Sequence, residues 1–109
     1  MRSIVFYRDA AGNDCVTEWM KSLQDETALR ALTRRLIGIQ MDLAGDWRPL
    51  GGGLFETRVH VGAGYRIYYA AITMRSILLL AGGTKRTQKR DIEIARVRLK
   101  EWRTSHGIN

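Results

Sequence analysis

The sequence predicts an α+β fold in which an antiparallel sheet packs against a helical hairpin, with the element order β-α-α-β-β-β-α. Three observations support this prediction. The 109 residues suffice for one hydrophobic core but not for two, so we expect residues 1–109 to form one domain. Hydrophobic residues make up 45% of the chain and proline occurs once, which is typical of a folded protein. Helical spacing of the apolar residues changes to strand-like runs near residue 53 and returns towards the C-terminus.

The N-terminal half predicts one strand and two helices. Ser3–Tyr7 (SIVFY) is a short apolar strand, and the turn-forming residues 9–13 follow it. Asn13 or Asp14 can cap a helix that runs to about residue 24, and Asp25 can cap a second helix. The second helix carries an apolar stripe at steps of three and four residues: Leu29, Leu32, Leu36, Ile39 and Leu43. Two adjacent helices with a short junction form a hairpin that can cover a sheet.

The C-terminal half predicts three strands and a helix. Residues 45–53 break the helical spacing and contain Pro49. Leu54–Val61 and Tyr65–Thr73 are apolar-rich strands, and Gly62-Ala63-Gly64 joins them. The third strand, Ser76–Ala81, is apolar almost throughout, which indicates an interior position in the sheet. Residues 87–105 then have the spacing of a final helix.

The two glycine-linked strands place polar and apolar residues on opposite faces. If residues 62–64 form a three-residue loop, Val61 pairs with Tyr65 across the two strands. His60 then faces Arg66, and directly opposite residues share a face. One face, which we expect to be exposed, carries the polar set: Glu56, Arg58, His60, Arg66 and Tyr68. The other face carries the apolar set that packs on the helices: Phe55, Val59, Val61, Tyr65, Ile67 and Tyr69. A two-residue loop would move Arg66 to the core face, so the pattern favours the odd loop.

The basic charge of the chain is concentrated in its C-terminal part. The net charge is +7, and residues 47–109 contain twelve Lys or Arg against four Asp or Glu. This asymmetry indicates an anionic partner, with nucleic acid as the leading class. We expect no membrane partner, because the basic segments lack a broad apolar face and no apolar run approaches the length of a span, about 18 residues.

The cysteine and histidine content limits the compartment and the cofactors. Cys15 is the single cysteine of the chain, so an internal disulfide is impossible and we expect a cytoplasmic protein. His60 and His106 are the two histidines, and neither has a cysteine or carboxylate at ligand spacing. We therefore expect no metal and no other cofactor.

Two interpretations of the polar face are open. The face can be a solvated surface with cross-strand ion pairs, or a surface that binds phosphate and cleaves RNA. Arginine forks match phosphate oxygens bidentately, which favours the second interpretation. The segment GGTKRTQKR adds four cations after the third strand: Lys85, Arg86, Lys89 and Arg90. Cations at a helix N-terminus oppose the helix dipole, which suggests a role in ligand binding.

Three segments resemble a known family: LFETRV (Leu54–Val59), GYRIYYA (Gly64–Ala70) and LLLAGGTKRTQKRDIEIA (Leu78–Ala95). In these segments and their order the chain resembles the RelE/HigB-type toxins of bacterial toxin–antitoxin modules, specifically the phage-derived addiction-module killer proteins. The resemblance covers essentially the whole chain and implies a small α+β fold with the same element order. It also implies an endoribonuclease that cleaves mRNA in the ribosomal A site without metal, until a cognate antitoxin neutralises it. We expect that antitoxin to be a small helix-turn-helix protein that forms a hetero-oligomer with the toxin.

The resemblance further implies roles for single residues. Arg66 matches the arginine of the family's Tyr-Arg strand, which contacts the scissile phosphate. Lys85 or Arg86 matches the basic position after the last strand, and Arg58 matches a basic strand residue. Glu56 departs from members that have lysine there, although some relatives use glutamate as the base.

The remaining assignments follow from the chemistry of metal-free RNA cleavage. This reaction needs a base for the 2′-hydroxyl, cations for the phosphate and an acid for the leaving 5′-oxygen. We assign Arg66 and Arg58 to the phosphate with Lys85 in support, Glu56 as the base, and His60 as an acid or a base. The general acid stays open, because a catalytic tyrosine or histidine near the start of the last helix has no clear counterpart here. The residues expected to bind RNA are Tyr68, which can stack on a base, and Arg86, Gln88, Lys89 and Arg90.

Two other functions are compatible with the sequence. A ParE-like toxin has the same fold and inhibits DNA gyrase without cutting RNA, and a plain RNA-binding domain would share the basic charge. Acid–base groups beside paired arginines favour the nuclease, because gyrase binding does not require them.

Overall fold

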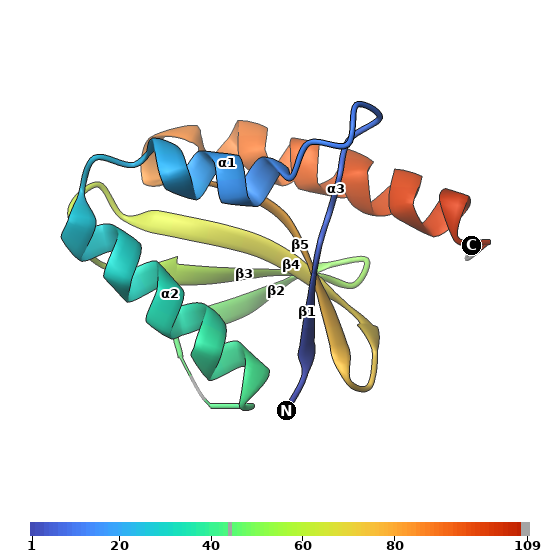
Figure 1. Ribbon diagram of the computed structural model, residues 1–109, viewed down its shortest axis with the longest axis horizontal. Helices are drawn as coiled ribbons and strands as arrows, with labels where there is room; N and C mark the ends of the chain where they lie inside the picture. The colour runs from blue at the N-terminus through green and yellow to red at the C-terminus, as the bar shows by residue number, and fades with distance from the viewer. Residues whose placement is uncertain (44, 108–109) are drawn as a thin grey trace.

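The computed structural model describes residues 1–43 and 45–107 and has the α+β fold that the sequence predicts. Its strands form one five-stranded sheet in the order β1-β5-β4-β3-β2 (Figure 1). The elements are β1 (Ser3–Phe6), α1 (Cys15–Ser22), α2 (Glu26–Gln40), β2 (Trp47–Gly51), β3 (Leu54–Val59), β4 (Tyr65–Thr73), β5 (Ser76–Thr84), a 3-10 turn (Lys85–Thr87) and α3 (Gln88–Ser105).

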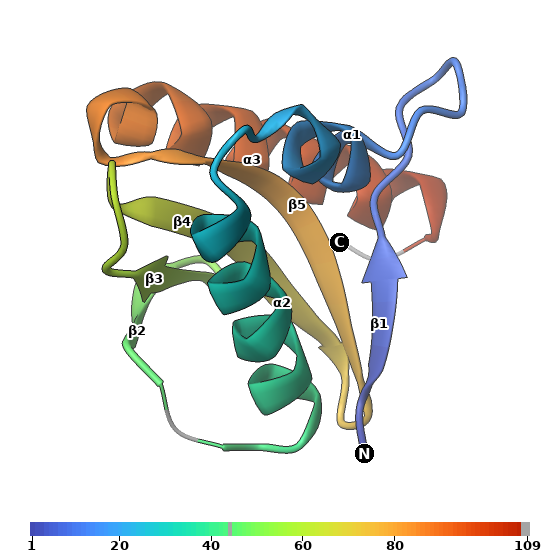
Figure 2. The same ribbon diagram turned by 60° about the vertical axis from the view of Figure 1, so that its left-hand side comes forward.

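Both predicted helix caps are confirmed. The side chain of Asp14 accepts a hydrogen bond from the backbone N–H of Thr17, and that of Asp25 accepts one from Ala28. Each carboxylate thereby satisfies one of the backbone donors that a helix leaves free at its N-terminus. The two caps fix where α1 and α2 begin. Both helices pack on the same face of the sheet, but they lie at a steep angle to each other and not as the antiparallel hairpin that the sequence predicted (Figure 2).

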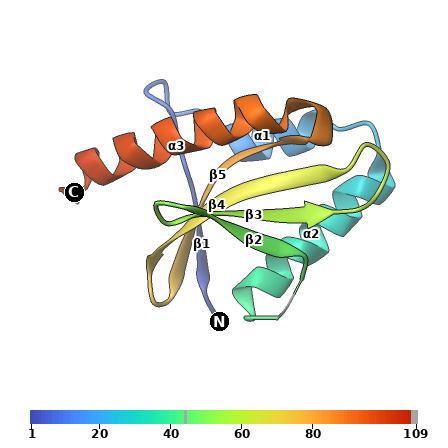
Figure 3. The same cartoon turned by 180° about the vertical axis from the view of Figure 1, so that it is seen from behind.

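Helices cover both faces of the sheet, whereas the sequence predicted that one face would be exposed. α1 and α2 lie on one face (Figure 2), and α3 lies on the other (Figure 3). Alternate residues of β5 reach different cores: Leu79 packs beneath α1 and α2, and Leu78 and Leu80 pack beneath α3. A continuous apolar run such as ILLL is typical of a strand buried on both faces.

The sheet differs from the prediction in two further respects. β2 lies within residues 45–53, where the sequence predicted only a break, and its Pro49 conceals it from pattern recognition. β2 is an edge strand, a position where proline is tolerated because one side of the strand needs no backbone donors. β1 pairs with β5 in parallel, so the sheet is mixed and not wholly antiparallel.

The hairpin of β3 and β4 has a different register from the predicted one. Val59, not Val61, is the partner of Tyr65, and residues 60–64 form the connection. Gly62 and Gly64 adopt φ values of 54° and 74° there, in the left-handed region that glycine enters without strain. The register differs from the predicted one by two residues, which is the period of side chains along a strand. The predicted residues therefore still share each face of the sheet, but His60 lies outside the strand.

Two arginines of α3 hold the helix against the β2–β3 turn. The Arg96 guanidinium donates to the carbonyl oxygens of Leu50 at 2.6 Å and Gly51 at 3.2 Å. Arg103 donates to the carbonyl of Gly52 at 3.1 Å. These bonds position the start of β3, and therefore the polar residues that β3 carries beneath α3.

Candidate functional site

The centre of the site is the carboxylate of Glu56, whose residue has no exposed surface. Its Oε1 accepts hydrogen bonds from Nε of Arg48 and Nε of Arg58, both at 3.0 Å. Its Oε2 accepts one from Nε2 of Gln88 at 2.8 Å, and Nε of Arg66 lies 3.7 Å away. One carboxylate therefore collects side chains from β2, β3, β4 and α3. We call Arg48, Arg58 and Arg66 the arginine cluster.

The electrostatics of Glu56 suit a fixed counter-charge for the arginine cluster better than a general base. A buried carboxylate is tolerated only when it is paired and hydrogen-bonded. Burial alone would raise the pKa of Glu56, but the hydrogen bonds from Gln88, Arg48 and Arg58 outweigh burial, so the pKa lies below its ordinary value. A general base works best with a pKa near the operating pH and a free oxygen. The geometry therefore does not favour the base role that the sequence suggested for Glu56.

Arg66 is buried, which corrects the prediction that it lies on an exposed face. The residue is 6% exposed, and α3 covers the face from which it extends. Its Nη1 donates to the carbonyl of Gly64 at 3.2 Å. Its buried Nε has no hydrogen-bond partner among the described residues. The guanidinium is thus held by the connection that precedes its strand and by Glu56, and it has further N–H donors that these contacts do not use.

The other cations of the site are more accessible than Arg66. The side chains of Arg48 and Arg58 are 46% and 29% exposed, and Lys85 is exposed. The backbone N–H of Lys85 donates to the carbonyl of Gly64 at 2.8 Å. A Cβ at Gly64 would lie 3.7 Å from both Nη1 of Arg66 and Cβ of Lys85. The backbone of Lys85 therefore lies beside Arg66.

Three further cations lie on the surface where α3 begins. Arg86, Lys89 and Arg90 are exposed and line a shallow hollow together with Thr87 and Glu93. Gln88 is half-buried and points the other way, towards Glu56. The four residues predicted to bind RNA here thus divide into three surface cations and one amide that supports the buried carboxylate.

Tyr68 does not have the exposure that stacking on an RNA base requires. It is the cross-strand partner of Glu56 and is fully buried beneath α3. Burial raises the pKa of Tyr68, and the neighbouring carboxylate of Glu56 raises it further. Within the part of the chain that the structure describes, its hydroxyl has no hydrogen-bond partner. The predicted stacking role is wrong for this arrangement, because α3 occupies the space that a base would need.

The start of α3 is fixed by a buried carboxylate that the sequence did not single out. Asp91 is 4% exposed and accepts a hydrogen bond from the Thr87 hydroxyl at 2.5 Å. A Cβ on Gly83 would lie 1.8 Å from Oδ2 of Asp91, so this position of β5 requires glycine. Gly83 is also the cross-strand partner of Arg66. The close approach seats α3 on the sheet and directs Gln88 onto Glu56.

His60 lies apart from the arginine cluster. It is exposed, and its Nε2 pairs with the carboxylate of Asp46. That hydrogen bond lowers the pKa of Asp46. The predicted position opposite Arg66 belongs to Arg58 instead, because the hairpin register differs by two residues.

Arg48 was absent from the sequence-based site. It lies in WRPLG, where the proline and glycine obscure the strand, and it reaches Glu56 because the two residues are cross-strand partners. The feature of the sequence that could have revealed this strand is the alternation of Trp47, Arg48 and Pro49 before a glycine turn. Among the described residues, no group of three or more His, Cys, Asp or Glu side chains is placed to hold a metal ion. Nor does any described helix have the length and hydropathy needed to cross a membrane.

Comparison with known proteins identifies the family. Residues 18–100 match the sequence model of the family described as phage derived protein Gp49-like (DUF891). An uncharacterized protein of Haemophilus influenzae is 32% identical over 83 residues, which cover 76% of this chain and 84% of that protein. The matched residues include the arginine cluster and most of α3. The chain therefore belongs to the Gp49-like family of phage-derived proteins, a family associated with toxin–antitoxin modules.

Proposed function

We propose that this chain is a toxin of the RelE/HigB type that cleaves mRNA on the ribosome as a metal-independent endoribonuclease. The arginine cluster is the observation that carries the proposal. Three guanidiniums converge on Glu56, and Lys85 lies beside Arg66. One carboxylate cannot neutralise this many cations, so a net positive charge is left for an anion. Guanidiniums bind phosphate oxygens with two parallel hydrogen bonds, which makes the RNA backbone the matching anion.

The proposed reaction is a transfer within the RNA strand. The 2′-oxygen attacks the adjacent phosphorus, the 5′-oxygen leaves, and the products carry a 2′,3′-cyclic phosphate and a 5′-hydroxyl. Arg58 and Arg66 bind the non-bridging oxygens, and each such donor contributes about 10²–10³-fold to the rate. Lys85 protonates the leaving 5′-oxygen. Solvent accepts the 2′-hydroxyl proton, because the Glu56 oxygens are occupied and His60 lies apart from the arginine cluster. The proton transfer from Lys85 contributes about 10²–10⁴-fold.

Glu56 acts in this proposal as a positioning residue and not as the base. Its two oxygens are occupied by Arg48, Arg58 and Gln88, and its pKa is lowered. These contacts hold the guanidiniums in one arrangement before RNA binds. Preorganised donors avoid the cost of reorientation during the reaction, which is the main source of electrostatic catalysis.

The test is primer extension on a message translated in a reconstituted system. The wild-type chain should produce discrete cuts with 5′-hydroxyl ends, and cleavage should survive EDTA at levels that leave ribosomes intact. Arg58→Ala should reduce cutting by about 10²-fold. Arg75→Ala is the matched control, because it removes an exposed arginine from the turn between β4 and β5. Ends with a 5′-phosphate would contradict the proposed reaction. Intact mRNA together with inhibited plasmid supercoiling would support the ParE-like alternative.

A further inference from the structure

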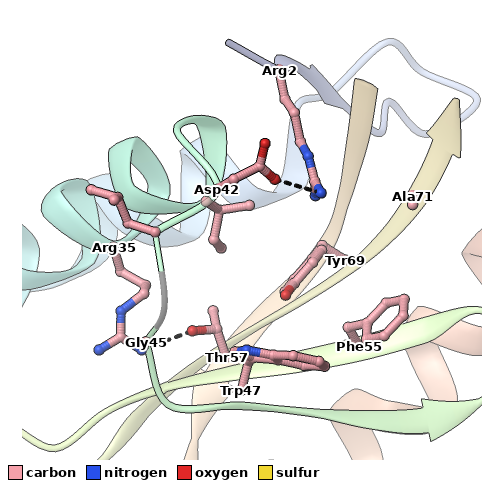
Figure 4. Close-up of a pocket in the computed structure, with 11 residues that line it drawn as sticks. Arg2, Arg35, Asp42, Gly45, Trp47, Phe55, Thr57, Tyr69 and Ala71 are labelled. Atoms are coloured by element: carbon pink, nitrogen blue, oxygen red, sulfur yellow. Dashed lines mark hydrogen bonds and ion pairs between the residues drawn. The ribbon is translucent and has the colours of Figure 1, made fainter. Parts of the chain in front are cut away.

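A cavity of about 390 Å³ lies on the face of the sheet opposite the arginine cluster, between the end of α2 and strands β2 to β4 (Figure 4). Trp47, Phe55 and Tyr69 form its aromatic wall. The Trp47 and Phe55 rings meet edge to face with centroids 5.8 Å apart, and Phe55 stacks on Tyr69 at 5.7 Å. The remaining lining residues are Arg2, Arg35, Ile39, Asp42, Leu43, Gly45, Thr57 and Ala71.

Two exposed apolar side chains line this cavity, and two more lie at the C-terminal end of α2. Leu43 and Trp47, which line it, are 63% and 51% exposed. Ile37 and Met41, on the last turn of α2 and at its C-cap, are 50% and 52% exposed. Isolated exposed apolar residues are normal, but a group of them around an aromatic hollow is typical of an interaction site. Tryptophan, tyrosine, methionine and arginine are also the residues enriched at protein–protein interfaces.

The charge around the cavity selects among possible occupants. Arg2 and Arg35 line the cavity together with one acidic residue, Asp42, which forms an ion pair with Arg2 at 2.6 Å (Figure 4). Arg35 donates to Thr57 and to a backbone carbonyl and has no carboxylate partner among the described residues, so its charge is left for an occupant. Elsewhere on α2, Arg30 and Arg34 stand against one acidic residue, Glu26. A second copy of the chain would bring its own net charge of +7 to this basic face. RNA would place phosphates against the apolar rim. An acidic protein segment with a large apolar side chain matches both the arginines and the aromatic wall.

We propose that this cavity docks an acidic segment of the cognate antitoxin, which inserts one large apolar side chain between Trp47 and Leu43. The inference rests on the toxin–antitoxin part of the proposed function and not on the cleavage chemistry. The occupant lies behind the sheet and leaves the arginine cluster uncovered. Binding at the cavity is coupled to the arginine cluster through β2. Trp47 lines the cavity, and the next residue, Arg48, donates a hydrogen bond to Glu56.

The probe for the test is the small protein encoded by the reading frame next to this gene, titrated calorimetrically into the full chain. Leu43→Glu places a negative charge at the cavity mouth and should weaken binding at least tenfold. Leu43→Lys loses the same packing but keeps charge complementarity, so it should bind more tightly than Leu43→Glu. Met74→Glu is the matched control, because Met74 is 95% exposed in the turn between β4 and β5. This variant should bind the probe as tightly as the wild type does. Thermal melts of each variant establish that it is folded.

Several outcomes would overturn the proposal. These are equal affinity of Leu43→Glu and wild type, equal weakening by the Glu and Lys variants, and no binding by the wild type. Self-association of the wild type that Leu43→Glu abolishes would assign the cavity to a second copy instead. Cleavage by the wild-type chain is measured without the probe, so a failure of docking is distinguishable from a failure of the proposed nuclease function.

Discussion

Arg58 of β3 and Arg66 of β4 are direct cross-strand partners, and both approach the carboxylate of Glu56. Like charges in directly opposite positions destabilise a sheet. The buried carboxylate offsets this repulsion and keeps both guanidiniums on the same side. In the proposed function the two guanidiniums bind one phosphate group together, and the predictions on cleavage depend on this arrangement.

Replacing Arg66 should affect both stability and cleavage. Arg66→Ala removes a buried guanidinium and its bonds, which should destabilise the fold by about 1–3 kcal/mol. This differs from the small effect expected of a surface residue, because Arg66 is buried. Cleavage in single-turnover assays, run well below the melting temperature of the mutant, should fall by about 10²-fold or more. Arg66→Lys should recover only part of the rate, since an ammonium cannot form the two-pronged contact. A folded Arg66→Ala protein that cuts at the wild-type rate would remove Arg66 from the site.

Neutralising Glu56 should destabilise the protein strongly. Glu56→Gln leaves Arg48, Arg58 and Arg66 without their shared counter-charge, and breaking a buried ion pair in this way costs about 3–5 kcal/mol. Urea denaturation measures the change in the free energy of unfolding. Glu93→Gln is the control, because Glu93 is exposed on α3, and it should stay within about 0.5 kcal/mol of wild type. Equal stability of the two variants would show that Glu56 does not organise the cluster.

The lowered pKa of Glu56 predicts how stability depends on pH. The pKa in the folded protein lies below its ordinary value of 4.5, so the unfolded chain binds the proton more readily. The stabilisation is therefore complete above pH 4.5 and is lost as the pH falls towards the folded-state pKa. Urea midpoints recorded from pH 6 to pH 3 should fall more steeply for wild type than for Glu56→Gln. Asp9 and Asp46 also have lowered pKa values and titrate in both proteins, so the difference between the two curves isolates Glu56.

Lys85 should matter for cleavage and not for stability. Its side chain is exposed beside Arg66, so Lys85→Ala should change the unfolding free energy by no more than about 0.5 kcal/mol. As the proposed proton donor, Lys85 should contribute about 10²-fold or more to the single-turnover rate. Lys100→Ala is a matched control, because it removes the same charge from an exposed position further along α3. Equal cleavage rates for the two variants would show that Lys85 contributes only positive charge and is not the proton donor.

Gly83 should tolerate no larger side chain. The Cβ of Gly83→Ala would lie 1.8 Å from Oδ2 of Asp91, so α3 must move or the Asp91 carboxylate must leave its partner Thr87. We expect a loss of about 1–3 kcal/mol, as for other overpacked sites, together with reduced cleavage because Gln88 is displaced from Glu56. Gly38→Ala provides the contrast, because its Cβ would lie 4.0 Å from Cβ of Leu43, an ordinary contact, and alanine should stabilise α2 by about 0.5–1 kcal/mol. Differential scanning calorimetry of the two variants measures both changes.

The strand alternation in LFETRV and GYRIYY was sufficient to predict which residues share a face, but not their register. Alternation has a period of two residues, so pairings that differ by two residues satisfy it equally. The five-residue connection decides between them, and its glycines left the length of the loop open. His60 was therefore placed in the strand, whereas it lies in the connection and pairs with Asp46.

Burial of the polar face could not be predicted from the strands themselves. Glu56, Arg66 and Tyr68 follow the pattern of a solvated face, and their polarity gives no sign of a cover. The cover is α3, whose apolar stripe was recognised without any indication of which face of the sheet it contacts. β2 was missed for a local reason, since Pro49 and the following glycines match a turn as well as they match an edge strand.

The alternation of β3 has a consequence for how such a protein can evolve. Phe55 and Thr57 line the cavity, while the alternate residues Glu56 and Arg58 belong to the candidate site on the other face of the sheet. A substitution at Phe55 or Thr57 changes the side chain offered to one side of the sheet and leaves the other side in place. A one-residue insertion or deletion in β3 would exchange the two sets. Divergent relatives should therefore vary freely in the identity of the cavity residues while the length of this strand stays constant, so that recognition can diversify without change to the chemistry.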